Sequence, residues 1–205
     1  MELFPLVSPI LFAFGVTVLG FITPGYSHLT HTVSRLAIEK YGWIQSLNFF
    51  QLAIALYLTG MRLTDLIRKD TADKVIRTIF VVCSIFLIIA AFFPTDPIEN
   101  VPLDLSLLSP TGLVHMSVVV MFLMLSPLGI ISLANVFLRE ADLKRYAIPT
   151  LVAGFTAFFG SIVWFAFYFL GIYLEYRGIF QKAIAIPILI WLILINYAVI
   201  KKSHN

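Results

Sequence analysis

The sequence predicts an all-α integral membrane protein, a bundle of six transmembrane helices. The first observation is composition: the 205-residue chain is 60% hydrophobic and 12% charged, whereas soluble domains average about 45–50% apolar and about 25% charged residues. The second is length, because six apolar runs each approach the roughly 20 residues that cross a bilayer as a helix. A water-soluble fold could not bury so much apolar surface, so we expect lipid to surround most of the chain.

The six apolar runs are separated by polar connections. Inside a bilayer a helix satisfies each backbone N–H and C=O internally, so every run is expected to be helical. The expected spans cover about residues 3–22, 46–67, 75–93, 113–138, 146–174 and 182–200, in one transmembrane domain over residues 1–205. The first run has the acidic Glu2 and no basic residue before it, so we expect a retained span and not a signal peptide.

Lys and Arg residues are distributed unevenly between the two sets of connections. With the N-terminus inside, the cytoplasmic set holds ten of them and the opposite set four. The ten are Arg62, Arg68, Lys69, Lys74, Arg77, Arg139, Lys144, Arg145, Lys201 and Lys202, and the four are Arg35, Lys40, Arg177 and Lys182. Because short cytoplasmic loops carry an excess of Lys and Arg, both termini are predicted to be cytoplasmic, in a cell membrane.

The distribution of charges and the single cysteine argue against nucleic-acid binding, an intramolecular disulfide and transport. The net charge of +3 is dispersed among loops without a basic stripe, so nucleic acid is not expected as a partner. Cys83 lies alone in an apolar run and permits no intramolecular disulfide. Transport is disfavoured because the centres of the spans hold almost no ionisable side chain.

The connection after the first span contains an amphipathic pattern. In GYSHLTHTVSRL, residues 25–36, helical phasing at about 100° per residue places His28, Thr32 and Arg35 on one polar stripe, with leucine and valine on another side. We therefore expect an amphipathic helix over about residues 27–38, at the outer membrane surface or over the mouth of the bundle. The same phasing turns Ser27 away from His28, which disfavours a catalytic pair within the segment.

This segment and the long connection FPTDPIENVPLDLSLLSPTGLVH are both expected on the outer side. They carry His28, Arg35 and Asp96, with His115 at the start of the fourth span. We predict that these four residues form an outer polar pocket. In a second interpretation Asp96 caps a turn or the following short helix and pairs with His115 or Arg35, which closes the end of the bundle without doing chemistry.

Two kinds of catalysis would fit the residue types. In an acyl-transfer site His28 or His115 would act as the base and Asp96 would orient it, and Ser27 or Ser34 would be the nucleophile. In a metal site the zinc ligands would be His28, His31, Asp96 and His115. Neither spacing is diagnostic, because no G-x-S-x-G or H-E-x-x-H motif is present. We expect no cofactor, with zinc as the alternative.

A characteristic order of short motifs runs through most of the chain. Its elements are Tyr26, Ser27, His28, Ser34 and Leu36 after the first span, FPTDP at residues 93–97, and His115. This order resembles the domain of unknown function 998 family (DUF998) of polytopic membrane proteins, which is similar to six-span proteins of the FRAG and DRAM type. The resemblance implies a membrane fold and no defined activity. Arg35 departs from the family pattern, in which an acidic or small residue stands at this position.

The sequence alone favours binding over catalysis. Gly154, Gly160 and Gly171 interrupt the aromatic residues of GFTAFFGSIVWFAFYFLGIY in the fifth span, and small residues let helices approach closely. We expect a lipid-binding protein or an accessory subunit of a membrane assembly, with membrane lipids and other membrane-protein subunits as partners. The alternative is a lipid-directed hydrolase or transferase with an outer-face His/Asp site.

Overall fold

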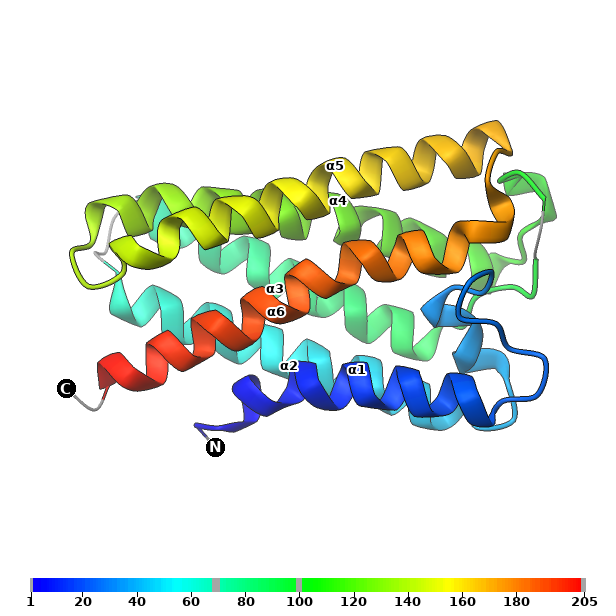
Figure 1. Cartoon of the computed structure of the whole chain (residues 1–205), viewed down its shortest axis with the longest axis horizontal. Helices are drawn as coiled ribbons and strands as arrows, with labels where there is room; N and C mark the ends of the chain where they lie inside the picture. The colour runs from blue at the N-terminus through cyan, green and yellow to red at the C-terminus, as the bar shows by residue number, and fades with distance from the viewer. Residues whose placement is uncertain (1, 68–70, 99–100, 204–205) are drawn as a thin grey trace.

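The computed structural model describes residues 2–67, 71–98 and 101–203 as a helical bundle (Figure 1). Within them the long helices are α1 (Phe4–Ile22), α2 (Gly42–Leu66), α3 (Thr71–Phe92), α4 (Pro110–Arg139), α5 (Ala147–Leu170) and α6 (Arg177–Ser203). Short 3-10 helices in the connections are η1 (Val33–Ile38), η2 (Leu105–Leu107), η3 (Lys144–Tyr146) and η4 (Leu174–Tyr176). The described residues contain no strand, and the predicted all-α bundle of six long helices is confirmed.

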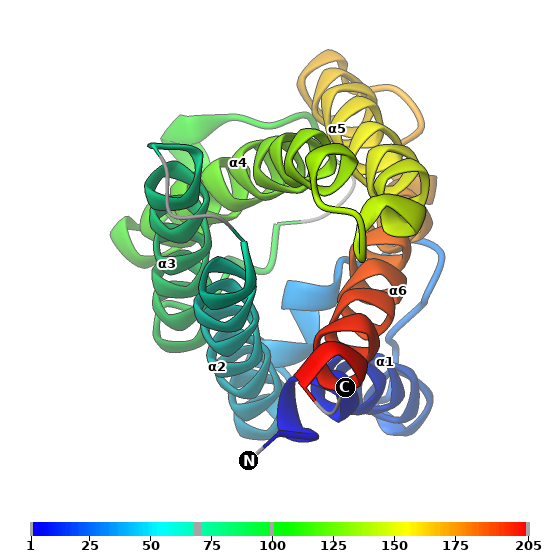
Figure 2. The same cartoon turned by 90° about the vertical axis from the view of Figure 1, so that its left-hand side faces the viewer.

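The six helices form a closed ring. Each packs against its neighbours in the sequence, and α6 also packs against α1. Figure 2, which looks along the bundle, shows α1 to α6 following one another around the axis. The start of α1, the end of α6, the adjoining ends of α2 and α3, and the α4–α5 connection lie at one end, the terminal end (Figure 1). The other connections, residues 23–41, 93–98, 101–109 and 171–176, lie at the opposite end, the distal end.

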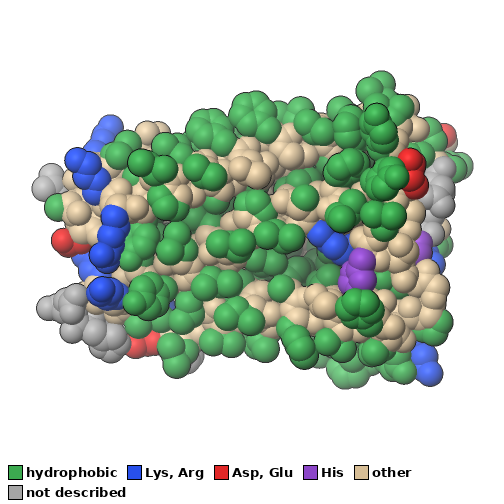
Figure 3. Space-filling view, viewed as in Figure 1, with side chains coloured by type: hydrophobic (Ala, Val, Ile, Leu, Met, Phe, Trp, Pro, Cys, Tyr) green, Lys and Arg blue, Asp and Glu red, His purple; other side chains and the backbone are tan. Residues whose placement is uncertain are grey.

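A belt of apolar side chains covers the middle of the ring. All six long helices are long and apolar enough to cross a membrane, and large side chains such as Phe21, Ile148 and Phe155 are exposed on the outside. Figure 3 shows this belt, with most of the visible Lys and Arg side chains gathered at the terminal end. Arg68 and Lys69, two of the residues that predicted the orientation, lie outside the described residues.

Helix boundaries differ from the predicted spans by a few residues, because local contacts set them. α4 begins at Pro110, where the Ser109 hydroxyl accepts a hydrogen bond from the Gly112 N–H at 3.1 Å. α5 ends at Leu170 because Gly171 adopts a left-handed φ of 69°, which glycine tolerates without strain. α6 begins at Arg177, ahead of the predicted start. The prediction started later because a hydropathy pattern does not recognise a buried arginine as part of a span.

Buried amide side chains join helices inside the apolar belt. Asn48 Nδ2 of α2 donates to the Phe12 carbonyl of α1 at 3.0 Å. Asn196 Nδ2 of α6 donates to Thr59 Oγ1 of α2 at 2.9 Å. Hydrogen bonds between helices in a membrane contribute about 0.6 kcal/mol each on average. Their main effect is to fix which faces of α1, α2 and α6 meet.

The predicted amphipathic helix over residues 27–38 is correct only in its second half. Residues 28–30 form a turn, and the 3-10 helix η1 begins at Val33. The Ser27 hydroxyl accepts hydrogen bonds from the N–H groups of Leu29 and Thr30 at 3.3 and 3.4 Å, which stabilises the turn against a helix. His28 and Arg35 therefore do not share one helical stripe.

Candidate functional site

A polar cavity lies at the distal end. About 40 Å³ of it can hold the centre of a water molecule, and one water needs about 10–15 Å³ on this measure. Of the four residues in the predicted pocket, Arg35, Asp96 and His115 line it and His28 does not. The lining residues are Thr32, Ser34, Arg35, Thr95, Asp96, Ile98, Leu108, His115, Met116, Val119, Trp164, Tyr168, Arg177 and Gln181. This distal cavity can hold a few waters or one compact chemical group.

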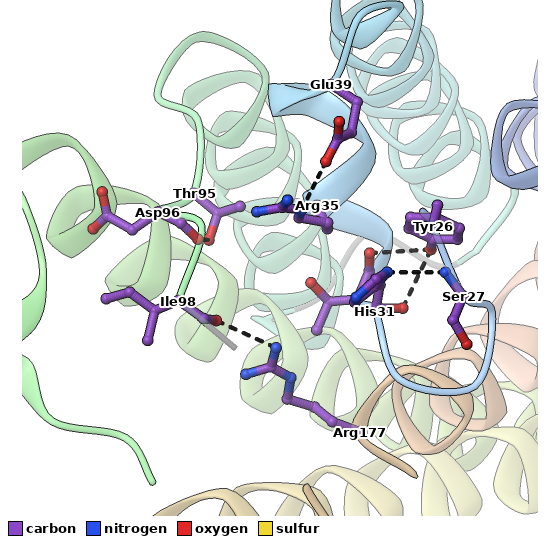
Figure 4. A network of polar contacts seen from close by, with 10 residues as sticks. Tyr26, Ser27, His31, Arg35, Glu39, Thr95, Asp96, Ile98 and Arg177 are labelled. Carbon is purple, nitrogen blue, oxygen red and sulfur yellow. Dashed lines mark hydrogen bonds and ion pairs between the residues drawn. The ribbon is translucent and has the colours of Figure 1, made fainter. Parts of the chain in front are cut away.

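Asp96 stabilises the N-terminus of α4. Its Oδ1 accepts a hydrogen bond from the Ser109 hydroxyl and its Oδ2 accepts one from the Ser109 N–H, both at 2.8 Å. A Cβ atom at Gly112 would overlap this carboxylate, so glycine is needed there. Figure 4 shows the Asp96 carboxylate pointing away from Arg35 and Arg177. A carboxylate is favourable at this place because the first N–H groups of a helix lack helical partners. The geometry thus agrees with a capping role for Asp96, at the start of α4 and not at a short helix, and without the expected pairing with His115 or Arg35.

Arg177 is the buried cation of the distal cavity, although its sequence position suggested only a loop charge. The residue is 7% exposed. Its Cζ lies 5.2 Å from the centroid of the Tyr168 ring, and its Nη2 donates to the Ile98 carbonyl at 3.3 Å. Its Nε is buried without a hydrogen-bond partner. Among the described residues no carboxylate pairs with Arg177, and an uncompensated buried charge costs several kcal/mol.

Arg35 lies across the distal cavity from Arg177, on η1. Its Nε is 2.8 Å from Glu39 Oε1, and both side chains are about a quarter exposed. In Figure 4 the side chains of Arg35 and Arg177 approach residues 95–98 from different elements. Glu39 offsets the charge of Arg35, whereas no carboxylate among the described residues pairs with Arg177. A guanidinium favours a planar or tetrahedral oxyanion, to which it can donate two hydrogen bonds.

His115 forms part of the cavity wall on α4 and is 2% exposed. Its Nδ1 lies 2.7 Å from the Phe93 carbonyl, and because a carbonyl only accepts, Nδ1 carries the proton. This bond ties the end of α3 to the start of α4. In the part of the chain that the structure describes, no hydrogen bond joins His115 to Asp96 or to Ser34. The arrangement therefore lacks the linked nucleophile, base and orienting acid of an acyl-transfer site.

Nearly the whole chain matches one protein family. The family is described as a protein of unknown function (DUF998), and the match covers residues 6–197. The chain belongs to the DUF998 family. No curated protein and no solved structure matches it. The DUF998 resemblance read from the motifs is confirmed, and the similarity to FRAG and DRAM proteins stays a prediction.

In this DUF998 protein the motif at residues 25–36 is a segment docked onto α6. The Tyr26 hydroxyl donates to the carbonyls of His31 and Thr32 at 3.2 and 3.1 Å. Burial raises the pKa of Tyr26, so the hydroxyl keeps its proton and remains a donor. Lys182 Nζ of α6 donates to the carbonyls of His28 and His31 at 3.0 and 2.9 Å. Tyr26 and Lys182 thus satisfy carbonyls that a continuous helix would have bonded internally.

The same face of α6 holds the start of η1. Gln181 is 8% exposed, and its Oε1 accepts a hydrogen bond from the Val33 N–H at 2.8 Å. Gly178 leaves room for the His31 backbone, which a Cβ atom would overlap. Through these contacts α6 positions η1, and with it Arg35, on the wall of the distal cavity.

His28 lies outside the distal cavity, against α1. Its ring centroid is 5.1 Å from that of Phe21 and 5.3 Å from that of Tyr26. A Cβ atom at Gly20 would overlap the imidazole. Partial burial lowers the pKa of His28, and the charge of Lys182 adds to this effect. His28 therefore packs as a neutral ring at neutral pH.

The predicted zinc ligands do not converge. His28 packs on α1, and His31 Nδ1 accepts a hydrogen bond from the Ser27 N–H at 2.9 Å. Asp96 and His115 lie at the distal cavity instead. Across residues 2–67, 71–98 and 101–203, no three His, Cys, Asp or Glu side chains lie close enough to hold a metal ion together. The zinc alternative thus lacks a ligand set in these residues.

Arg177 and Gln181 are the site residues that sequence reasoning missed. Their separation of four residues at the start of the sixth apolar run places them on one helical face, and this was the available signal. The indole of Trp164 on α5 donates to the Arg177 carbonyl at 2.9 Å and so fixes the start of α6. That contact joins distant segments and leaves no local pattern.

Proposed function

We propose that this DUF998 protein binds an amphiphile with a compact anionic head, a phosphate or a carboxylate, in the distal cavity. The observation that carries the proposal is the buried Arg177, whose Nε lacks a partner at the wall of a cavity large enough for such a group. An oxyanion would supply both the missing hydrogen bond and the missing negative charge. Asp96 and Glu39 do not compete for this role, because Ser109 and Arg35 engage them.

The depth of the distal cavity favours a lipid over a soluble anion. His115 lies within the candidate membrane span of α4, and Arg177 lies within that of α6. Both residues are close to the distal ends of these spans. Lipid headgroups are already at the membrane interface, so a headgroup reaches this depth while its chain stays among apolar side chains. The basic terminal end favours an orientation in the cell membrane with cytoplasmic termini, and the distal cavity then opens to the outer leaflet.

Native mass spectrometry of the protein in a neutral detergent tests the headgroup site. Stearoyl lysophosphatidic acid is compared with monostearoylglycerol, which has the same chain and no phosphate, and stearate provides the carboxylate head. We expect an anionic ligand to bind in preference to the glycerol ester. The substitution Arg177→Gln keeps hydrogen-bonding capacity but removes the charge, and should weaken anionic binding about tenfold, or about 1.4 kcal/mol.

The matched control is Arg145→Gln, which removes an exposed arginine charge at the terminal end. It should leave the affinity for the anionic ligand unchanged. Equal binding of the anionic and neutral ligands by the wild type, or unchanged anionic binding by Arg177→Gln, would overturn the proposal. The ratio between lysophosphatidic acid and stearate identifies which oxyanion the site takes.

A further inference from the structure

Two apolar cavities continue from the distal cavity toward the terminal end, inside the helix ring. The first has about 80 Å³ of space for water centres and shares Val119 and Gln181 with the distal cavity. The second has about 20 Å³ and shares Phe122 and Ile188 with the first. Adjoining cavities therefore share lining residues, and the three cavities form one series inside the helix ring, parallel to the axis of the bundle.

The chemistry of the walls changes along this series. In the first apolar cavity Ser34 and Gln181 are the polar lining residues, and both also line the distal cavity. Beyond them the walls are aliphatic and aromatic except for Cys83 and Ser126, which line the second apolar cavity. Water in such a space finds few hydrogen-bond partners, so apolar cavities stay dry and accept apolar occupants. The series thus begins with a cationic, polar cavity and continues with apolar cavities. This arrangement is complementary to an amphiphile with an anionic head and a single apolar chain.

The dimensions of the series fit an acyl chain. On α4 the lining runs from His115 in the distal cavity to Ile130 in the second apolar cavity. At 1.5 Å per residue this separation is roughly 22 Å. The hydrocarbon region of one leaflet is about 15 Å thick, half of the bilayer core, so the series is long enough for a complete chain. The small volumes, about 80 and 20 Å³, favour one chain over two.

We infer that the ligand is a single-chain anionic amphiphile whose head lies at Arg177 and whose acyl chain runs inside the helix ring. The inference rests on the proposed headgroup site and adds the class of ligand, a lysophospholipid or a fatty acid. The acyl chain of the ligand fills the empty space between α1, α2, α3, α4 and α6, and it is thereby removed from the surrounding lipid. A diacyl lipid is disfavoured, because these cavities form only one series that continues from Arg177.

Trp191 provides a reporter at the far end of the series. It is 1% exposed and lines the second apolar cavity. It lies 14 residues beyond Arg177 on α6, about 21 Å along the helix axis. Stearoyl lysophosphatidic acid brominated at the end of its chain should quench the fluorescence of Trp191. The quenching should disappear in Trp191→Phe, and an octanoyl analogue brominated at its end should not reach the indole.

A blocking variant separates the chain from the head. Ala185 lines the first apolar cavity, whereas Ala183, on the same helix, is exposed on the outside. Ala185→Phe should reduce affinity for stearoyl lysophosphatidic acid at least tenfold, and the matched Ala183→Phe should not change it. Labelling of the buried Cys83 thiol would show that Ala185→Phe has failed to fold, and Ala185→Leu is then used in its place. Distearoyl phosphatidic acid should bind the wild type at least tenfold more weakly than the single-chain ligand.

The outcomes distinguish the two proposals. Binding that depends on Arg177, with no quenching of Trp191 and no effect of Ala185→Phe, overturns the interior chain and leaves the headgroup site intact. Quenching of Trp191 that persists at unchanged affinity in Arg177→Gln overturns the headgroup site and supports the interior chain. Equal binding of the single-chain and diacyl ligands overturns the assigned ligand class.

Discussion

The Asp96→Asn substitution replaces a carboxylate oxygen with an amide nitrogen, which donates where the carboxylate accepted. One of the two hydrogen bonds from Ser109 is then lost, together with the negative charge at the N-terminus of α4. A typical hydrogen bond contributes about 0.5–1.5 kcal/mol and a charge at a helix N-terminus about 0.3–1 kcal/mol. Because Ser109 is exposed to solvent, we expect a loss of about 1–2 kcal/mol in the free energy of unfolding.

The single cysteine supplies the assay. Cys83 is 1% exposed in the folded bundle, so a thiol-reactive dye labels it only after unfolding. For a chain of about this size 1 kcal/mol corresponds to about 2–4 °C in Tm. Heating in a neutral detergent should therefore give a Tm for Asp96→Asn about 2–8 °C below that of the wild type, while binding of stearoyl lysophosphatidic acid is retained.

Asp104→Asn is the matched control for this prediction. Asp104 Oδ1 also accepts hydrogen bonds from a serine, at 2.9 and 2.7 Å from Ser106 N and Oγ. These bonds lower the pKa of Asp104, but the residue is exposed and caps only η2, so its substitution should shift Tm less. An unchanged Tm for Asp96→Asn together with lost ligand binding would refute the capping role and make Asp96 a ligand-binding residue.

Three further experiments test the docked segment and the interhelical contacts. Gly178→Ala should lower Tm and increase proteolysis near residue 31, because the new methyl group displaces the His31 backbone; cleavage equal to that of the wild type would contradict this. The lowered pKa of His28 means that the unfolded chain binds its proton more tightly, so this contribution is present above about pH 6.5 and is lost as the pH falls below it. Tm should therefore decrease more between about pH 7 and pH 5 in the wild type than in His28→Gln, and identical pH profiles would count against it. A double-mutant cycle of Asn196→Leu and Thr59→Val should give a coupling of about 0.6–1.7 kcal/mol, whereas additive effects would show that the pair does not interact.

The six spans were predictable because the surrounding lipid imposes the same requirement on every one of them. Each backbone group must be bonded within its own segment, so length and hydropathy alone define the helix. The boundaries depended on single residues instead. Gly171 ends α5 before the apolar run ends, and Arg177 starts α6 before the apolar run starts.

The distal cavity was only partly predictable, because most of it depends on contacts between distant segments. Common sidedness grouped Arg35, Asp96 and His115 in the prediction, and all three line the distal cavity. Helical phasing failed for His28, since it assumed a continuous helix where Lys182, more than a hundred residues later, bonds the backbone carbonyls. The charge of Arg177 was visible in the sequence, but its burial was not.

The closure of the ring by α1 and α6 has a consequence for the synthesis of the chain. Because the first and last helices close the ring, we expect a nascent chain of five spans to form an open bundle whose interior faces the lipids of the bilayer. α6 carries Arg177 and Gln181, so insertion of this last helix closes the interior and completes the distal cavity in the same step. We therefore expect a chain truncated before α6 to keep an apolar interior open to the membrane.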